Sequence, residues 1–351
     1  MSLSILRATL SLPTAPFHEQ AVAAHVRAFA LARKLPVRAD RFGNLIVRCQ
    51  RSRAQAIAFA AHMDHPGFEV VEVNGVAATL QSYGDTRGKN AVGAKIRAQT
   101  AHGEVTGVIE SVAEQRAMAR FAGTVAVGDF AQWDFPAYQL RGKRIYSRAI
   151  DDVAGCAALL AALDELSRTK TAVNLYAIFT RAEEVGFAGA TALASGNVLP
   201  KSVPVVSIET SKALRGAEQG KGYVVRLGDR ASMFDPALTQ FLLKVARELK
   251  VVPFQQRLME GGTCEATAFN VLGYTASGVC VPLCNYHNQG DRDIAPEYIH
   301  ADDFTGLVRF IVAACERAGE LRALQPLLRK RVLKLLQLHR KKLLETAGEI
   351  G

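Results

Sequence analysis

Histidine and carboxylate side chains gather in five short segments that lie far apart along the chain. Four of these segments directly follow an apolar run typical of a buried strand, and the fifth opens a helical pattern. Because functional groups in an open α/β sheet collect at the carboxyl ends of its strands, we expect these side chains to meet at one edge of a sheet. The residues are His62, Asp64, Asp151, Asp152, Glu183, Glu184, Glu209 and His287.

These residue types suit a hydrolytic metal site. Imidazole and carboxylate ligands without thiolate favour zinc, cobalt or manganese. Two ions roughly 3.5–4 Å apart need one carboxylate shared between them. Asp64, two residues beyond His62, is placed to accept the other imidazole N–H and so to fix the tautomer. Because neighbouring side chains at a strand end diverge, one of Glu183 and Glu184 can bind metal while the other faces the attacking water.

Each segment alone also has a structural explanation. The two adjacent aspartates could simply cap the following helix, where negative charge is favoured. Paired glutamates in a loop are usually solvated charges, and a lone histidine is more often structural than a ligand. Glu209 fits this explanation less well, because a carboxylate after a buried strand is costly without a partner. The order and spacing of all five segments together favour the metal site.

The elements that must position these residues alternate between strands and helices. Residues 67–145 break that rhythm with short β-like runs separated by Gly, Asn and Asp. We therefore predict an α/β catalytic domain formed by residues 1–66 and 146–319, with an all-β domain over 67–145 inserted into it. The expected strands of the catalytic domain are 40–49, 55–62, 173–179 and 203–208, and its helices are 18–35, 152–166, 189–195, 236–250 and 302–321.

The motifs AHMDHPG, SRAIDDVAG and EEVGFAGA, in this order, resemble those of the glutamyl aminopeptidases and tetrahedral aminopeptidases. These are two-metal exopeptidases, and some members carry the description endoglucanase or cellulase M. The similarity covers about residues 1–318. It implies a phosphorylase/hydrolase-like three-layer αβα domain with a small β-barrel insertion. It also implies peptide substrates and a homo-oligomer, which in this family is often a dodecameric tetrahedral particle.

The resemblance further implies a role for each residue. Glu183 would act as the general base and acid, and Asp64 would orient the first histidine. Asp151 would bridge two divalent ions, with zinc as the first expectation and cobalt or manganese as the others. The remaining ligands would be His62 and Glu209 on one ion, and Glu184 and His287 on the other.

The chain departs from the family pattern around the predicted site. Glu209 stands where the family usually has Asp, and Val153 replaces the Arg that usually follows the two aspartates. Ala182 replaces a Gln before the glutamate pair, and Cys264–Glu265 replaces an Asp. These changes remove no ligand type, but they leave substrate choice and metal affinity open.

Composition limits the class of protein. The chain has 351 residues, of which 49% are hydrophobic and 22% charged, as in a globular protein. No apolar stretch approaches the ~20 residues needed to cross a bilayer. Six cysteines in a chain of this length indicate reduced thiols rather than a disulfide framework. We therefore expect a cytoplasmic protein without a membrane span.

The formal charge of +10 is concentrated in a C-terminal extension, residues 320–351. Its last 31 residues, 321–351, carry eight Lys and Arg against Glu345 and Glu349, with leucines at helical spacing. The pattern predicts a basic amphipathic helix that packs on its own domain or on a sister subunit, with acidic partners or anionic lipid as alternatives. The rest of the chain is only mildly basic, so we do not expect it to bind nucleic acid.

Other functions fit parts of the pattern. An amidohydrolase or carboxypeptidase could use the same two-metal site, but it would need a basic group to receive a substrate carboxylate. A non-catalytic peptide-binding relative would be expected to lack Glu183 or a ligand, and a nucleic-acid binder would use the basic tail. A glycosidase is disfavoured, because the carboxylates are better explained as metal ligands. The sequence thus predicts a metallo-aminopeptidase that uses a metal-bridging water and Glu183.

Overall fold

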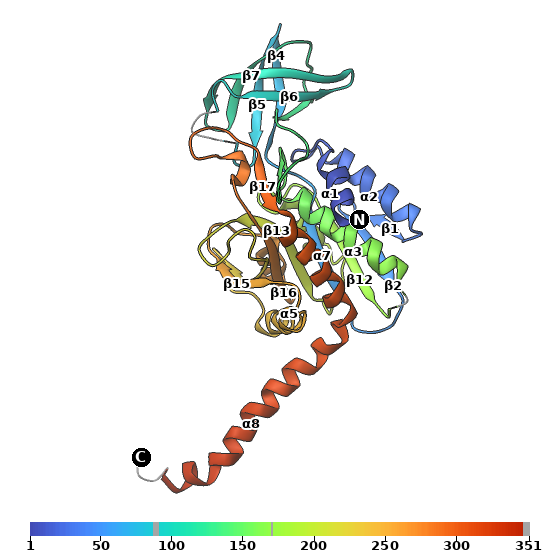
Figure 1. Ribbon diagram of the computed structural model, residues 1–351, viewed down its shortest axis with the longest axis vertical. Coiled ribbons are helices and arrows are strands. Elements are labelled where there is room, and N and C mark those ends of the chain that lie inside the picture. The colour runs from blue at the N-terminus through green and yellow to red at the C-terminus, as the bar shows by residue number, and fades with distance from the viewer. Residues whose placement is uncertain (87–90, 170, 347–351) are drawn as a thin grey trace.

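A computed structural model describes residues 1–86, 91–169 and 171–346 (Figure 1). Its centre is an eight-stranded mixed sheet with the strand order β1-β2-β12-β3-β13-β16-β14-β15. In chain order these strands are β1 (Val37–Ala39), β2 (Leu45–Gln50), β3 (Ile57–His62), β12 (Asn174–Thr180), β13 (Val205–Lys212), β14 (Tyr223–Asp229), β15 (Phe254–Met259) and β16 (Ala276–Leu283).

The four central strands of this sheet are parallel. β12 and β13 flank β3, and β16 pairs with β13, all in the same direction. Every residue of β3 and β16 is buried, as expected for strands that are covered on both faces. Because the four strands run in the same direction, their carboxyl ends meet at one edge of the sheet.

Helices cover both faces of the sheet, which gives three layers. Alternate residues of a strand point to opposite faces. Phe59 and Ala61 accordingly join the core beneath α3 and α7, whereas Ala58 and Ala60 join the core beneath α4 and α6. The helices are α1 (Ser2–Leu10), α2 (Gln20–Ala32), α3 (Val153–Arg168), α4 (Ala188–Ser195), α5 (Pro236–Glu248), α6 (Glu265–Val271), α7 (Ala301–Glu316) and α8 (Leu321–Thr346).

A closed six-stranded antiparallel barrel is inserted directly after β3 (Figure 1). Phe68 and Trp133 meet edge to face in its core, with ring centroids 5.1 Å apart. After the barrel the chain forms β10 and β11, which pair with β17 in a small three-stranded sheet of order β10-β11-β17. The barrel strands are β4 (Gly67–Asn74), β5 (Ala77–Tyr83), β6 (Lys95–Thr100), β7 (Gly103–Ala113), β8 (Arg116–Phe121) and β9 (Phe130–Trp133). The small sheet comprises β10 (Gln139–Arg141), β11 (Arg144–Ser147) and β17 (Glu297–His300).

Several element boundaries differ from the sequence prediction, and the strand expected over 203–208 begins at Val205 and continues to Lys212. The strand expected from residue 40 begins only at Leu45, because Asp40 accepts the N–H groups of Phe42 and Asn44 and so closes a turn. The helix expected over 302–321 ends at Glu316 and is followed by a short 3-10 turn. The N-terminal helix α1 was not predicted, and its Leu6 and Leu10 are fully buried in the core.

The last helix, α8, points away from the body of the molecule (Figure 1). Every residue from Lys330 to Glu345 is exposed, so this stretch does not pack on its own domain. None of the described helices is long and apolar enough to cross a membrane. All six cysteines are free thiols.

Candidate metal centre

All five predicted metal ligands, together with Glu183, lie at the edge of the sheet where the parallel strands end. β3 and β13 each contribute a ligand, and the loop after β12 contributes the glutamate pair. The loop before α3 and the 3-10 turn η1 (Tyr286–Asn288), which follows β16, contribute the others. In chain order the residues are His62, Asp151, Glu183, Glu184, Glu209 and His287.

Asp151 lies between the two histidines. Its Oδ1 is 3.5 Å from Nε2 of His62, and its Oδ2 is 3.5 Å from Nε2 of His287. Nε2 of His62 is also 3.8 Å from Oε2 of Glu209, and Nε2 of His287 is 3.3 Å from Oε1 of Glu184. Two groups of three side chains therefore share Asp151, and within each group the potential ligand atoms lie within 4.8 Å of one another.

The polar atoms of this cluster fit a bound cation. Both ring nitrogens of His287 and Oε1 of Glu184 are buried, and none of them forms a hydrogen bond with a described residue. Oδ2 of Asp152 is likewise buried and has no hydrogen-bond partner among the described residues. Buried polar atoms are costly when they have no partner. Divalent cations between the side chains would satisfy these atoms and offset the excess of carboxylates.

The pKa shifts reflect the same excess of negative charge. Burial lowers the pKa of His62, but the surrounding carboxylates, with Glu183 the largest contributor, raise it well above its ordinary value. Burial raises the pKa of Glu183 well above its usual range, and repulsion from Glu209 and Glu184 adds to the rise. Without cations, therefore, the surroundings favour a protonated Glu183 and a positively charged His62.

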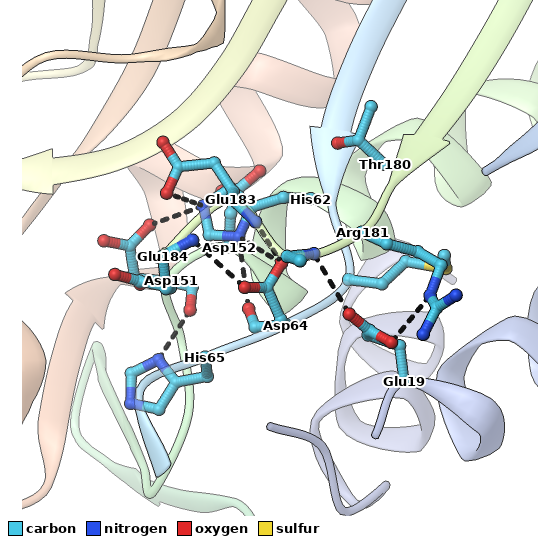
Figure 2. Close-up of polar contacts among 12 residues, drawn as sticks. Glu19, His62, Asp64, His65, Asp151, Asp152, Thr180, Arg181, Glu183 and Glu184 are labelled. Carbon is cyan, nitrogen blue, oxygen red and sulfur yellow. Dashed lines mark hydrogen bonds and ion pairs between the residues drawn. The ribbon is translucent and has the colours of Figure 1, made fainter. Parts of the chain in front are cut away.

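Two buried carboxylates hold the loop that carries the glutamate pair (Figure 2). Oδ1 of Asp64 accepts the N–H of Glu183 at 3.0 Å, and Oδ2 accepts the N–H of Glu184 at 3.1 Å. Oε1 of Glu19 accepts the N–H of Ala182 at 3.0 Å. Ala182 has a positive φ of 51°, so the chain turns sharply just before the pair. These contacts fix the directions in which the two glutamate side chains leave the loop.

Two oxygen atoms of Asp64 face Nδ1 of His62, and the nearer one is not the predicted carboxylate. Nδ1 of His62 bonds the backbone carbonyl of Asp64 at 3.1 Å, and the carboxylate lies 3.5 Å away. The carboxylate is turned towards the glutamate loop, where it accepts two N–H groups. The carbonyl therefore fixes the tautomer of His62, with Nδ1 protonated and Nε2 directed into the cluster.

The two aspartates before α3 are not used as a helix cap. Asp152 occupies the N-cap position, but its side chain makes no capping hydrogen bond. The hydroxyl of Thr210 instead donates to Oδ1 of Asp151 at 3.1 Å. A Cβ on Gly155 would lie 2.1 Å from Oδ2 of Asp152, so only glycine leaves room for this side chain. Both aspartates thus belong to the cluster.

Glu297 and His65 support the cluster and were missed by the sequence analysis. Glu297 is fully buried; its Oε2 accepts the N–H groups of Ile150 and Asp151 at 2.7 and 3.1 Å, and its Oε1 accepts that of His287 at 2.8 Å. Nδ1 of His65 lies 2.6 Å from the backbone oxygen of Asp151. The carboxylate of Glu297 therefore connects the loop of Asp151 to the loop of His287.

Comparison with known proteins decides the family. The model of the M42 glutamyl aminopeptidase family matches residues 112–308, which is more than half of the chain. The chain belongs to this family. The match confirms the relationship predicted from the sequence motifs, and it makes the protein a hydrolase of the aminopeptidase class. His62 and Asp64 lie before the matched residues.

Several proteins are similar to this M42 protein along most of their length. An aminopeptidase from the archaeon Desulfurococcus kamchatkensis has 21% identity and a TM-score of 0.79, and the match covers 92% of this chain and 97% of that one. The TET1 peptidase of Pyrococcus horikoshii has 22% identity and a TM-score of 0.78, with 90% and 99% covered. A protein of Acetivibrio thermocellus described as "Putative aminopeptidase" is 22% identical over 281 residues, or 72% of this chain and 81% of that protein. The structural matches confirm the predicted α/β fold.

The departures from the family pattern lie in the interior. Val153 is fully buried in the hydrophobic core, and Cys264 is 1% exposed at the start of α6. Glu265 is fully buried, and burial raises its pKa to about 8. Glu265 does not line the pocket beside Asp151, so it is not placed there to receive the free amine of a substrate.

A pocket beside the cluster contains a buried positive charge. It is lined by Asp151 and Glu209 and also by Arg226 and Lys212. Arg226 is only 2% exposed, and its guanidinium donates one hydrogen bond, to Oγ of Ser211 at 3.3 Å. No carboxylate among the described residues forms an ion pair with it. The pocket therefore places the positive charges of Arg226 and Lys212 next to the carboxylates of the cluster.

Proposed function

We propose that this M42 protein is a metal-dependent aminopeptidase that removes N-terminal residues from peptides with the help of two divalent ions. The observation that supports this most directly is the position of Asp151, whose two oxygens face two different histidines at 3.5 Å. A carboxylate shared in this way is what a pair of closely spaced ions requires. One ion would be held by His62, Glu209 and Asp151, and the other by Glu184, His287 and Asp151.

Bound ions, with zinc expected first and cobalt or manganese as alternatives, would act as Lewis acids that polarise the scissile carbonyl and make a bridging water more acidic. Glu183 also lies within ligand distance of His62 and Glu184, but the two groups that share Asp151 each have three ligands without it. Its Oε2 lies 4.0 Å from Nε2 of His62. It would accept a proton from the attacking water and deliver it to the leaving amine.

Asp64 and Glu297 would position these groups rather than react. Asp64 holds the backbone of Glu183 and Glu184, and Glu297 holds that of Asp151 and His287. Both carboxylates accept backbone N–H groups and so keep the loops in place when substrate enters.

We also propose that the protein forms a homo-oligomer. One similar structure is described as a dodecamer, and the Pyrococcus horikoshii TET1 peptidase is described as assembling into a tetrahedron or a large octahedral shell. The match covers 98% and 99% of the chains in those two structures, so nearly all of their backbone segments have counterparts in this fold.

The buried charge of Arg226 also supports a second candidate function. In an aminopeptidase, Arg226 would receive the side-chain carboxylate of an N-terminal Glu or Asp. In an amidohydrolase or a carboxypeptidase, it would receive the α-carboxylate of the substrate. The two functions differ in whether the substrate needs a free amine.

Substrates with and without a free amine should separate these functions. We expect glutamyl anilide, which has a free amine and no α-carboxylate, to be hydrolysed, and its N-acetylated form to be resistant. Release of the aniline from both compounds would be measured by absorbance on the same preparation. Cleavage of N-acetylglutamate in preference to the free anilide would instead identify an amidohydrolase.

Replacing Arg226 by Gln should reduce the preference for acidic N-terminal residues. A charge-assisted hydrogen bond contributes about 1.5–3 kcal/mol, so kcat/KM for glutamyl anilide should fall about 10- to 100-fold while that for leucyl anilide changes little. Arg230→Gln is the matched control, since Arg230 is exposed and outside the pocket. Equal loss on both substrates would show that Arg226 has only a structural role.

A further inference from the structure

The last helix has no role in the metal centre and lies outside the match to the M42 family, which ends at residue 308. Nε of Arg322 donates to Oε1 of Gln55 at 2.6 Å, which places the start of α8 next to the amino end of β3. His62 and the metal centre lie at the opposite, carboxyl end of that strand. From its start α8 leads away from the body (Figure 1).

Two rows of side chains lie on opposite sides of the exposed part of α8, with further leucines and basic residues between them. An apolar row recurs at the spacing i, i+4, i+11, and a lysine row has the same spacing but begins two residues earlier. Because successive helical residues are rotated by about 100°, the two rows lie about 200° apart, on opposite faces. The apolar row is Val332, Leu336 and Leu343, each at least 49% exposed, and the lysine row is Lys330, Lys334 and Lys341.

Charge argues against a second copy of this chain as the partner of α8. Residues 321–351 carry eight basic and two acidic residues, a net charge of +6 out of the total of +10. The remaining residues therefore carry a net charge of +4. Neither the tail nor the body of another copy offers a net negative charge, so the partner is expected to be anionic and to accept leucine side chains as well.

We propose that α8 binds anionic lipid at a membrane surface, with the apolar row at the boundary of headgroups and acyl chains and the lysines near the phosphates. None of the described helices is able to span a bilayer, so α8 lies on the surface. A nucleic acid would engage the lysines but leave the apolar row in water. Because α8 starts at the edge of the sheet opposite the metal centre, the active site faces away from the lipid.

Co-sedimentation of the full-length protein with vesicles tests this proposal. The protein should bind to phosphatidylcholine vesicles that contain phosphatidylglycerol, and it should bind much less to vesicles of pure phosphatidylcholine. Binding should weaken as salt is raised, because each lysine near the surface acts through a screened charge. Equal binding to both vesicle types, or no binding to either, would overturn the proposal.

Two double variants test the geometry of the helix. Leu336→Gln with Leu343→Gln removes most of the apolar row and should lower the bound fraction about tenfold or more. Leu338→Gln with Leu344→Gln makes the same change outside the row, and should have a much smaller effect. Both variants should retain wild-type hydrolysis of glutamyl anilide. An equal effect of the two variants on lipid binding would overturn the proposal. It would also be overturned if the wild-type protein formed an oligomer without lipid, and if the Leu336/Leu343 variant disrupted that oligomer while the control variant did not.

Discussion

Replacing Glu183 by Gln is expected to lower kcat by about 10²- to 10⁴-fold, the usual contribution of a general acid–base group. The amide has nearly the same shape but can no longer accept a proton from water. The backbone N–H of Glu183 would remain bound to Asp64, so the loop should keep its conformation. Metal content and the melting temperature should therefore stay close to those of the wild type. Turnover would be measured with glutamyl anilide, and bound metal by elemental analysis.

Glu184→Gln is the matched control, because it makes the same change one residue away. Glu184 lies 3.3 Å from Nε2 of His287 and would be a ligand, so this variant should lose metal as well as activity. The two roles are thus distinguished by metal content and not by rate alone. Turnover near the wild-type level in Glu183→Gln, or loss of metal from it, would contradict the assignment of Glu183 as general base.

The sequence was informative about the site because its residues sit at the ends of recognisable strands. A continuous apolar run marks a strand that is buried on both faces, and the residue that ends it must lie at the sheet edge. His62 was located in this way. Glu209 follows a similar apolar run, although β13 continues beyond it to Lys212, and its Oε2 lies 3.8 Å from Nε2 of His62 across 147 positions of the chain. The inserted barrel was visible as a change from helical spacing to short alternating runs with turn residues between them.

Residues that act through backbone contacts could not be predicted in the same way. Glu297 and Glu19 are single carboxylates, and what they do depends on loops that approach from distant parts of the chain. The orientation of Asp64 was missed for a related reason, since its carboxylate bonds N–H groups of residues 119 and 120 positions away. Arg226 resembles any arginine in a strand until the fold places it in a pocket beside Asp151.

Removing the metal ions with a chelator should abolish aminopeptidase activity and lower the melting temperature. The carboxylates and histidines of the centre are buried, and without cations they must take up protons or repel one another. An ion present at 100 times its Kd stabilises the folded state by about 2.7 kcal/mol, and this contribution would be lost for each ion removed. Adding zinc, cobalt or manganese should restore both activity and stability. Since metal displaces protons from these groups, affinity should fall as the pH is lowered.

Variants of the shared ligand distinguish two ions from one. Elemental analysis of the wild type should give two ions per chain. His287→Ala removes a ligand of only one ion and should leave the other bound, whereas Asp151→Asn weakens the ligand common to both and should deplete both. The asymmetry follows from the arrangement of the cluster, in which each histidine faces a different oxygen of Asp151. A single ion per chain in the wild type, or full retention of two ions in Asp151→Asn, would rule out a bridged pair at this position.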